Sequence, residues 1–179
     1  KNYYLFLLLL LCSSLMSTRA SAQGLYAIAE GEKPSNGLKI TSVPNITMTY
    51  GGNDAYTSDV WVSATADSPL DNFPAYTAGN TQNPKDDNGK SYTVASPSLP
   101  THGTYYVFQP LYDGTLCIAV VCNSGKPYFI TEDGVALSSY SGSTFATRFN
   151  GVDTISVKGN KTYYVFCTGS KMGFHGFSY

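Results

Sequence analysis

The sequence predicts an all-β protein that folds as a two-sheet antiparallel sandwich, jelly-roll-like, with about eight to ten strands. Three observations support this prediction. The chain of 179 residues contains 15 Tyr, 9 Phe, 17 Gly and 9 Pro, whereas only 13% of its residues are charged. The pentapeptide TYYVF occurs twice, at 104–108 and 162–166, and it combines residue types that favour buried strands. No amphipathic run of helical length follows the first twenty-odd residues, so we expect no helix beyond that segment.

Residues 1–22 have the pattern of a secretory signal peptide. Lys1 supplies a basic start, an apolar run extends from Tyr3 to Leu11, and Ala20-Ser21-Ala22 is a small-residue cleavage site. The apolar run is too short to span a membrane as a permanent helix. We therefore expect a secreted or cell-surface protein whose mature chain begins at Gln23.

The mature chain is mildly acidic. The full sequence has 11 basic and 12 acidic residues, and removal of Lys1 and Arg19 leaves 9 basic against 12 acidic residues, a net charge of −3. Binding to nucleic acid or to an anionic membrane requires clustered Lys or Arg. We therefore expect neither as a partner, and we predict no membrane span.

Three cysteines follow the predicted cleavage site: Cys117, Cys122 and Cys167. Cys117 and Cys122 lie on one predicted strand, about 16 Å apart at ~3.3 Å per residue, so they cannot bond to each other. Apolar neighbours favour buried free thiols, while pairing of Cys167 with Cys117 or Cys122 stays open. The spacing contains no CxxC pair and the two histidines are far apart, so we expect no metal and no cofactor.

The first part of the mature chain contains short strands and one long connection. We assign residues 23–37 to a turn-rich leader or linker and residues 38–179 to a single β-sandwich domain. Two short strands are predicted within 38–50, and the strict alternation of 59–67 indicates an amphipathic strand. The stretch 68–90 is rich in Pro, Asn, Asp and Gly, and a connection of this length is often functional or mobile.

From Ser91 onward the pattern predicts a meander of strands joined by tight turns. The predicted strands cover 91–94, 104–108, 116–122, 127–131, 154–158 and 161–167, and we interpret 138–143 as a polar loop. Glycine-containing pairs that are typical of hairpin tips occur at Asp113-Gly114, Asp133-Gly134 and Gly159-Asn160.

The last of these turns predicts a hairpin in which Ile155 lies opposite Tyr164. In that register Tyr164 and Phe166 face the core. Tyr163 and Val165 then lie on a mixed second face that is either capped by another segment or partly open.

The second half of the chain resembles a known module. The residues that carry the likeness are GTYYVFQPLYDGTLCIAVVCNSGKPYFITEDG and ISVKGNKTYYVFCTGSKMGFHGFSY, and the likeness extends over 38–179. They resemble a jelly-roll-like β-sandwich module of secreted proteins from gut bacteria of the Bacteroides and Prevotella group. That module occurs alone or beside pectate-lyase-like and other polysaccharide-active domains. The resemblance implies a carbohydrate-associated accessory domain, and it carries no site residues over.

We expect that the protein is not an enzyme. His102 lies in a predicted loop and His175 in a predicted strand, and neither belongs to a recognisable catalytic motif. Glycoside hydrolysis would need two inward carboxylates in a cleft. All twelve acidic residues are predicted to lie in turns, loops or strand ends, where solvation explains them.

The leading hypothesis is a secreted, non-catalytic carbohydrate-binding domain whose partner is a polysaccharide or glycan. Trp61 is predicted on the polar face of a strand, where an indole is either covered by a loop or available to stack on a sugar ring. The other candidate binding residues, in or beside predicted loops, are Tyr56, Phe73, Tyr76 and Tyr140.

One further partner and two alternative functions also stay open. A neighbouring catalytic domain is a second candidate partner. The chain is alternatively a structural surface adhesin or fibre subunit, which self-associates through strand edges and the mixed face containing Tyr163. A passive spacer within a longer polypeptide is the third possibility.

Overall fold

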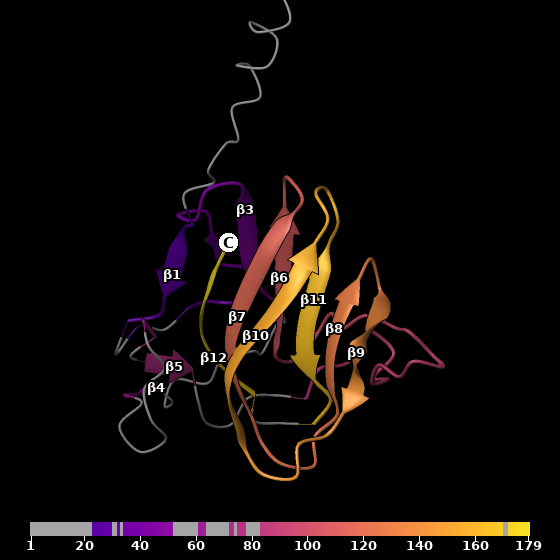
Figure 1. Ribbon diagram of the computed structural model, residues 1–179. Helices are drawn as coiled ribbons and strands as arrows, with labels where there is room; N and C mark the ends of the chain where they lie inside the picture. Colours follow the sequence, from indigo (N-terminus) through magenta and orange to yellow (C-terminus); the bar gives the residue numbers. More distant parts are fainter. Residues whose placement is uncertain are drawn as a thin grey trace, which may run out of the picture.

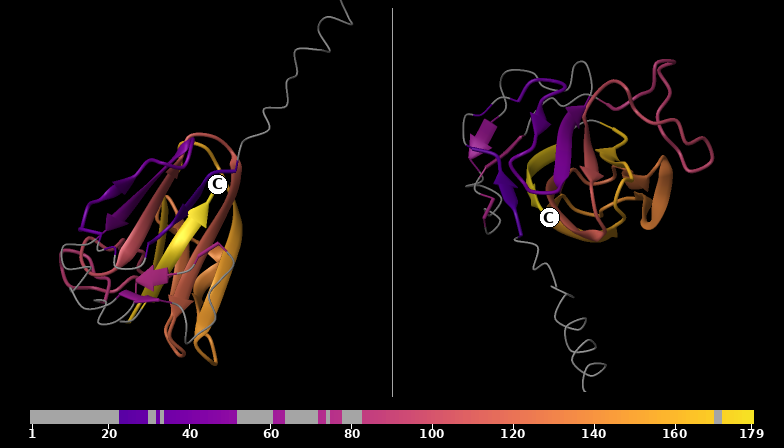
Figure 2. Two further views of the ribbon diagram at one scale, coloured as in Figure 1. Left: turned by 90° about the vertical axis from the view of Figure 1, so that its left-hand side faces the viewer. Right: turned by 90° about the horizontal axis from the view of Figure 1, so that it is seen from above.

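The computed structural model is a two-layer β-sandwich. It describes residues 23–29, 32, 34–51, 61–63, 72–73, 75–77, 83–169 and 172–179, with the backbone alone for 61–63 and 75–77, so the predicted signal peptide lies outside the described residues. Ten strands form two antiparallel sheets with a shared core, which confirms the predicted fold class (Figures 1 and 2). No helix occurs within the described residues, and thus none there is long and apolar enough to cross a membrane.

The sheets differ in size. The four-stranded sheet has the order β1 (Leu25–Ala27), β12 (Met172–Ser178), β7 (Gly114–Cys122) and β10 (Phe149–Val157). The six-stranded sheet has the order β2 (Lys39–Ile40), β3 (Ile46–Gly51), β6 (Tyr105–Pro110), β11 (Tyr163–Cys167), β8 (Tyr128–Glu132) and β9 (Val135–Ser143). A separate two-stranded ladder joins β4 (Trp61–Ser63) to β5 (Ala75–Thr77).

The two TYYVF segments are the central strands of the larger sheet, as their composition predicts. They form β6 and β11, which are antiparallel neighbours, with Tyr164 opposite Val107 and Tyr163 opposite Phe108. Strands in this position are hydrogen-bonded on both sides, and β-branched and aromatic side chains suit both of their faces.

Most turns in the second half of the chain join different sheets. The chain crosses from one sheet to the other between β6 and β7, β7 and β8, β9 and β10, β10 and β11, and β11 and β12. Among the described connections from β6 onward, only β8–β9 is a hairpin, and its tip, Asp133-Gly134, has the positive φ angles of 46° and 90° that a primed turn requires. The hairpins predicted at Asp113-Gly114 and Gly159-Asn160 are wrong, because each of these turns links one sheet to the other.

These two crossover turns are held against each other at one end of the sandwich. The Asp113 carboxylate accepts hydrogen bonds from the backbone N–H of Gly159 at 3.0 Å and from the Lys158 ammonium at 2.8 Å. The Asn160 N–H donates to the carbonyl of Pro110 at 2.8 Å. A glycine-containing turn indicates that the chain reverses direction. It does not indicate whether the next strand pairs with the preceding strand or joins the other sheet.

The crossovers also reverse the predicted faces of β11. Ile155 lies opposite Leu116 of β7 and not opposite Tyr164. Tyr163 and Val165 are fully buried between the sheets, where the sequence predicted Tyr164 and Phe166. The physical reason is that β11 is apolar on both faces, so alternation alone could not identify its inner side.

Aromatic rings fill the core between the sheets. Phe174 of β12 stacks on Tyr106 of β6 with ring centroids 4.6 Å apart, and meets Tyr50 of β3 edge to face at 5.8 Å. Each such ring buries roughly 150–250 Å². Contacts of this kind bring β3, β6 and β12 together although they are distant in the sequence.

A second cluster lies on the outer side of the six-stranded sheet. Tyr92, from the connection 83–104, packs against Phe129 at 5.0 Å and against Phe166 at 5.3 Å. Its hydroxyl donates to the carbonyl of Gly134 at 2.9 Å, which ties the connection to the β8–β9 tip. Phe166 is therefore buried, as predicted, but in this outer cluster.

Three segments differ from the expected secondary structure. Residues 91–94 form a turn with one bridge between Thr93 and Ser96 in place of a strand. Residues 138–143, predicted as a loop, belong to β9, because pairing with β8 satisfies a backbone whose side chains are polar. Residues 25–27, predicted within the leader, form β1 and pair with β12, so the sandwich begins ahead of Leu38.

Candidate carbohydrate-binding face

The five residues predicted to bind carbohydrate do not form one described site. Tyr56 lies outside the described residues. Trp61 and Tyr76 belong to the paired strands β4 and β5, where Trp61 is opposite Thr77 and Tyr76 is opposite Val62. Phe73 and Tyr140 have described side chains; Phe73 lies outside the named strands, and Tyr140 belongs to β9 of the six-stranded sheet.

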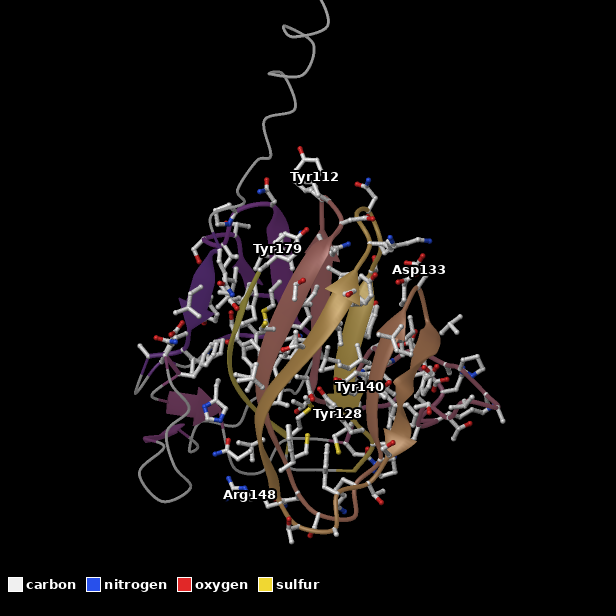
Figure 3. The ribbon with its side chains drawn as sticks, in the orientation of Figure 1. Tyr112, Tyr128, Asp133, Tyr140, Arg148 and Tyr179 are labelled. Atoms are coloured by element: carbon white, nitrogen blue, oxygen red, sulfur yellow. The ribbon has the colours of Figure 1, made fainter. Side chains whose placement is uncertain are left out.

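The side chains of Phe73 and Tyr140 both pack against neighbouring residues, which leaves little of Phe73 and only part of Tyr140 exposed. Phe73 is 5% exposed and lies over β12, where a Cβ atom added to Gly176 would come within 2.8 Å of the Phe73 ring. Tyr140 is half-buried in β9 and meets the ring of Tyr128 edge to face, with centroids 5.9 Å apart (Figure 3). Tyr140 thus lies in a strand and not in the predicted polar loop.

A different set of aromatic residues lies on the outer face of the six-stranded sheet. Tyr106 and Phe108 point into the core, so the alternate residues of β6 point outward. The same alternation directs Tyr164 of β11 outward, next to Tyr105. We call the following half-buried or exposed outward residues the tyrosine face: Thr47, Thr49, Tyr105, Val107, Gln109 and Tyr164.

The two TYYVF copies build this face because they face opposite ways. The copies are 58 positions apart, so equivalent residues of the two copies are both odd-numbered or both even-numbered. Paired residues of β6 and β11, which share a face of the sheet, are always one odd-numbered and one even-numbered. Equivalent residues of the two copies therefore point to opposite faces. The first tyrosine is therefore outward in β6, as Tyr105, and the second is outward in β11, as Tyr164. Identical sequences thus place one tyrosine each in the core, Tyr106 and Tyr163, and one each on the surface.

The rings of Tyr105 and Tyr164 are held in place by Gly51 of β3 and by the outer aromatic cluster. Its rings are nearly parallel, 22° apart, with centroids 5.7 Å from each other. The Tyr105 ring lies over Gly51 of β3, where an added Cβ would come within 1.9 Å of the ring, so only glycine permits this position. The cluster of Tyr92, Phe129 and Phe166 packs against both rings.

This arrangement suits a polyhydroxylated ligand. The stacked tyrosine rings offer apolar surface at their outer edges and unshared ring faces, and the threonine hydroxyls and the Gln109 amide beside them supply hydrogen-bonding groups. Because strands on both sides fix the backbone of β6 and β11, the face requires little reorganisation on binding.

A largely buried carboxyl group, that of Asp153, lies between the sheets on the inward side of β10. Asp153 of β10 is opposite Ile118, a core residue, and therefore faces inward. Burial raises the pKa of Asp153, and the hydroxyls of Tyr128 and Tyr140 oppose that rise. Neither Tyr128 Oη nor Asp153 Oδ2 makes a hydrogen bond of standard geometry within the described residues.

Asp153 corrects the prediction that every acidic residue lies in a turn, loop or strand end. Its sequence signal was its position on the apolar side of FNGVDTISV, two residues before Ile155 and four before Val157. β10 is an edge strand of its sheet. An inward charge on such a strand discourages pairing with another chain, which gives Asp153 a structural explanation.

The end of the sandwich near the chain terminus carries polar contacts and one exposed ring. Tyr163 donates its hydroxyl to Glu132 at 2.5 Å, and burial together with this hydrogen bond raises the pKa of Tyr163 to about 12. Tyr112 is 56% exposed at the β6–β7 turn, and its carbonyl accepts a hydrogen bond from Tyr179 Oη at 2.6 Å (Figure 3). Tyr112 is thus an exposed aromatic residue in the β6–β7 turn, outside the tyrosine face.

The two histidines lie in different parts of the fold. His175 is fully buried in β12, and its Nε2 lies 2.8 Å from Asn150 Oδ1 of β10. His102 lies 3.2 Å from the Asp87 carboxylate in the connection before β6. Among the described side chains, no group of three or more His, Cys, Asp or Glu residues is arranged to hold a metal ion.

Comparison with known proteins adds no relative. No protein-family model matches the chain, and no curated protein matches it.

Proposed function

We propose that the protein is a secreted, non-catalytic carbohydrate-binding domain, and that it binds its glycan on the tyrosine face. The observation that carries this proposal is the near-parallel pair of Tyr105 and Tyr164, anchored on one side and half-exposed on the other. The predicted signal peptide supports an extracellular location, and the resemblance of the second half to carbohydrate-associated modules supports the ligand class.

The chemistry of the face matches a sugar chain better than it matches an ionic ligand. None of the six residues that define the face is charged, and their polar groups are hydroxyls and one amide; the exposed Lys39 borders the face opposite Thr49. A pyranose ring has an apolar C–H face, which the tyrosine rings can cover, and hydroxyls at its rim, which threonine and glutamine can bind.

The expected contribution of each ring is modest. Aromatic contacts contribute about 0.5–1.5 kcal/mol beyond the area that they bury. Removal of one ring should therefore weaken binding roughly 2- to 10-fold, since 1.4 kcal/mol corresponds to a factor of ten. Removal of both rings should abolish a weak interaction.

Affinity gel electrophoresis against pectic and other polysaccharides tests the proposal. Wild type should be retarded by at least one polysaccharide, Tyr164→Ala less so, and the double variant Tyr105→Ala/Tyr164→Ala not at all. Tyr112→Ala is the matched control, because it removes an exposed tyrosine away from the face. Equal retardation of all variants, or none of wild type, would refute the proposal.

Trp61→Ala belongs in the same series. The sequence identifies Trp61 as a sugar-stacking candidate, and β4 is not part of the sheet that carries the tyrosine face. If Trp61→Ala loses retardation and the double tyrosine variant retains it, the protein binds glycan but at a site near β4.

The alternative function is a surface adhesin or fibre subunit that associates through strand edges. The length of the edge strand β9, which has nine residues, favours it, whereas the inward Asp153 opposes pairing at the other long edge, β10. The mixed face proposed for Tyr163 is wrong, because that side chain is buried. Light scattering across a concentration series tests the edges, and a strict monomer at high concentration would exclude this alternative.

A further inference from the structure

Two cysteines occupy facing positions in the core. Cys122 is the last residue of β7 in the four-stranded sheet, and Cys167 is the last residue of β11 in the six-stranded sheet. Their side chains are 0% and 1% exposed, and both belong to the cluster that fills the space between the sheets. Each cysteine thus points from its own sheet toward the other.

The chain brings the two residues together at one end of the sandwich. Cys122 lies opposite Met172, the first residue of β12, in the β7–β12 ladder. Only four residues separate Cys167 from Met172, and this short segment crosses from one sheet to the other. The Cys167 thiol is also the largest cause of the raised pKa of Cys122, which is consistent with the two side chains being neighbours in the core.

The third cysteine of the domain is directed elsewhere. Cys117 is half-buried on the outer side of β7, where its sulfur lies 3.6 Å from the hydroxyl of Thr154. It lies five positions from Cys122 on the same strand and faces the opposite side of the sheet. Of the two partners that the sequence left open for Cys167, the structure therefore selects Cys122.

We propose that Cys122 and Cys167, which are free thiols in this structure, are a disulfide-forming pair that cross-links the two sheets. The reaction is thiol–disulfide exchange with an external disulfide, either low-molecular-weight or carried by an oxidoreductase. One cysteine thiolate attacks that disulfide and releases one thiol, and the second thiolate then displaces the other, so two protein thiols are oxidised and one disulfide is reduced. The product is a sulfur–sulfur bond of about 2.05 Å between the two sheets.

The burial of the pair determines when the bond forms. The neighbouring Cys167 thiol and burial both raise the pKa of Cys122, so the reactive thiolate is scarce in the folded protein. Exchange should therefore take place during folding, before the core closes. The predicted signal peptide would deliver the unfolded chain to an environment where such oxidants are present.

The bond should stabilise the fold. It closes a loop between positions 45 residues apart. A cross-link over a loop of this length restricts the unfolded chain enough to raise the melting temperature of a domain of this size by roughly 10 °C.

The test is refolding in a glutathione redox buffer, followed by alkylation of free thiols and non-reducing peptide mapping by mass spectrometry. The expected result is a linked Cys122–Cys167 peptide with Cys117 alkylated, and a melting temperature that falls on addition of a reductant. Cys117→Ser is the matched control from the same strand and should keep both properties. Cys122→Ser and Cys167→Ser should lose the linked peptide and the response to reductant.

Wild type alone decides the question if a serine variant fails to fold. Full alkylation of Cys122 and Cys167 after refolding under oxidising conditions would overturn the proposal, as would a linked peptide that contains Cys117 in comparable amount. Addition of the same buffer to protein already folded in reductant should give the bond at least tenfold more slowly, because the thiols are then buried.

Discussion

Replacing Tyr163 or Tyr164 by alanine distinguishes the observed sandwich from the hairpin that the sequence suggests. Tyr163 is fully buried, and truncation of a buried aromatic ring costs about 3–5 kcal/mol. Its hydroxyl also accepts a hydrogen bond from the Lys158 N–H at 2.7 Å and donates to Glu132, and loss of such a partner costs about 1–3 kcal/mol. We expect Tyr163→Ala to lower the free energy of unfolding by about 5 kcal/mol.

Tyr164 is the matched position on the same strand. It is half-buried, and the strand keeps its hydrogen bonds to β6 and β8 whatever side chain points outward. Because only part of its ring is removed from water, we expect Tyr164→Ala to cost about 1–2 kcal/mol. The two variants should therefore differ by about 3 kcal/mol.

Urea unfolding followed by far-UV circular dichroism measures this difference. A domain of this size has a total stability of about 5–15 kcal/mol, so Tyr163→Ala is expected to be partly unfolded even without denaturant. Tyr163→Phe keeps the ring and isolates the hydroxyl contribution, which we expect to be about 1–2 kcal/mol. A larger loss in Tyr164→Ala than in Tyr163→Ala would refute the observed faces of β11 and favour the hairpin register.

Three further predictions concern single positions. Burial raises the pKa of Asp153 in the folded protein, so protonation of this carboxyl stabilises the fold below about pH 4, and this stabilisation is lost as pH rises through the raised pKa. Asp153→Asn should therefore reduce the fall in the free energy of unfolding between pH 4 and pH 7, measured by urea titration. An unchanged fall would contradict this prediction. Gly51→Ala should displace Tyr105, because the added Cβ would lie 1.9 Å from its ring, and should weaken glycan binding as much as loss of that ring does; wild-type retardation in affinity gels would show that the position of the ring is unimportant. Asp133→Val should cost about 1–3 kcal/mol in thermal unfolding, since the native φ of 46° is unfavourable for a β-branched residue and Val cannot accept the hydrogen bond that the Thr162 N–H donates to the Asp133 carboxylate at 3.0 Å. Asp133→Asn tolerates this φ and keeps an acceptor, so it should cost less than about 1 kcal/mol; equal losses would contradict this explanation.

The strands were easier to predict from the sequence than their arrangement. The composition of TYYVF identified β6 and β11 as central strands, and Asp133-Gly134 identified the β8–β9 hairpin. Glycine-containing turns do not reveal whether the next strand pairs with the last one or moves to the other sheet. That choice depends on contacts between turns, such as the bond from Gly159 to Asp113, whose residues are 46 positions apart.

The candidate site was harder to predict for a related reason. The orientation of Tyr105 and Tyr164 depends on the odd–even register between β6 and β11, which neither strand specifies alone. The space for the Tyr105 ring above β3 depends on Gly51, which lies just beyond the strands predicted within 38–50. Tyr140 was predicted in a loop because the residues around it are polar, whereas an edge strand tolerates such residues when one neighbour supplies its hydrogen bonds.

β11 shows how stability and binding can be separated within one strand. Its inward residues, Tyr163, Val165 and Cys167, hold the core and the proposed cross-link, and its backbone is fixed by β6 and β8. The outward Tyr164 contributes to the tyrosine face without supporting the core. Substitutions on the outer side of the sheet can therefore change which ligand the face accepts at little cost to folding, whereas substitutions on the inner side affect the whole domain.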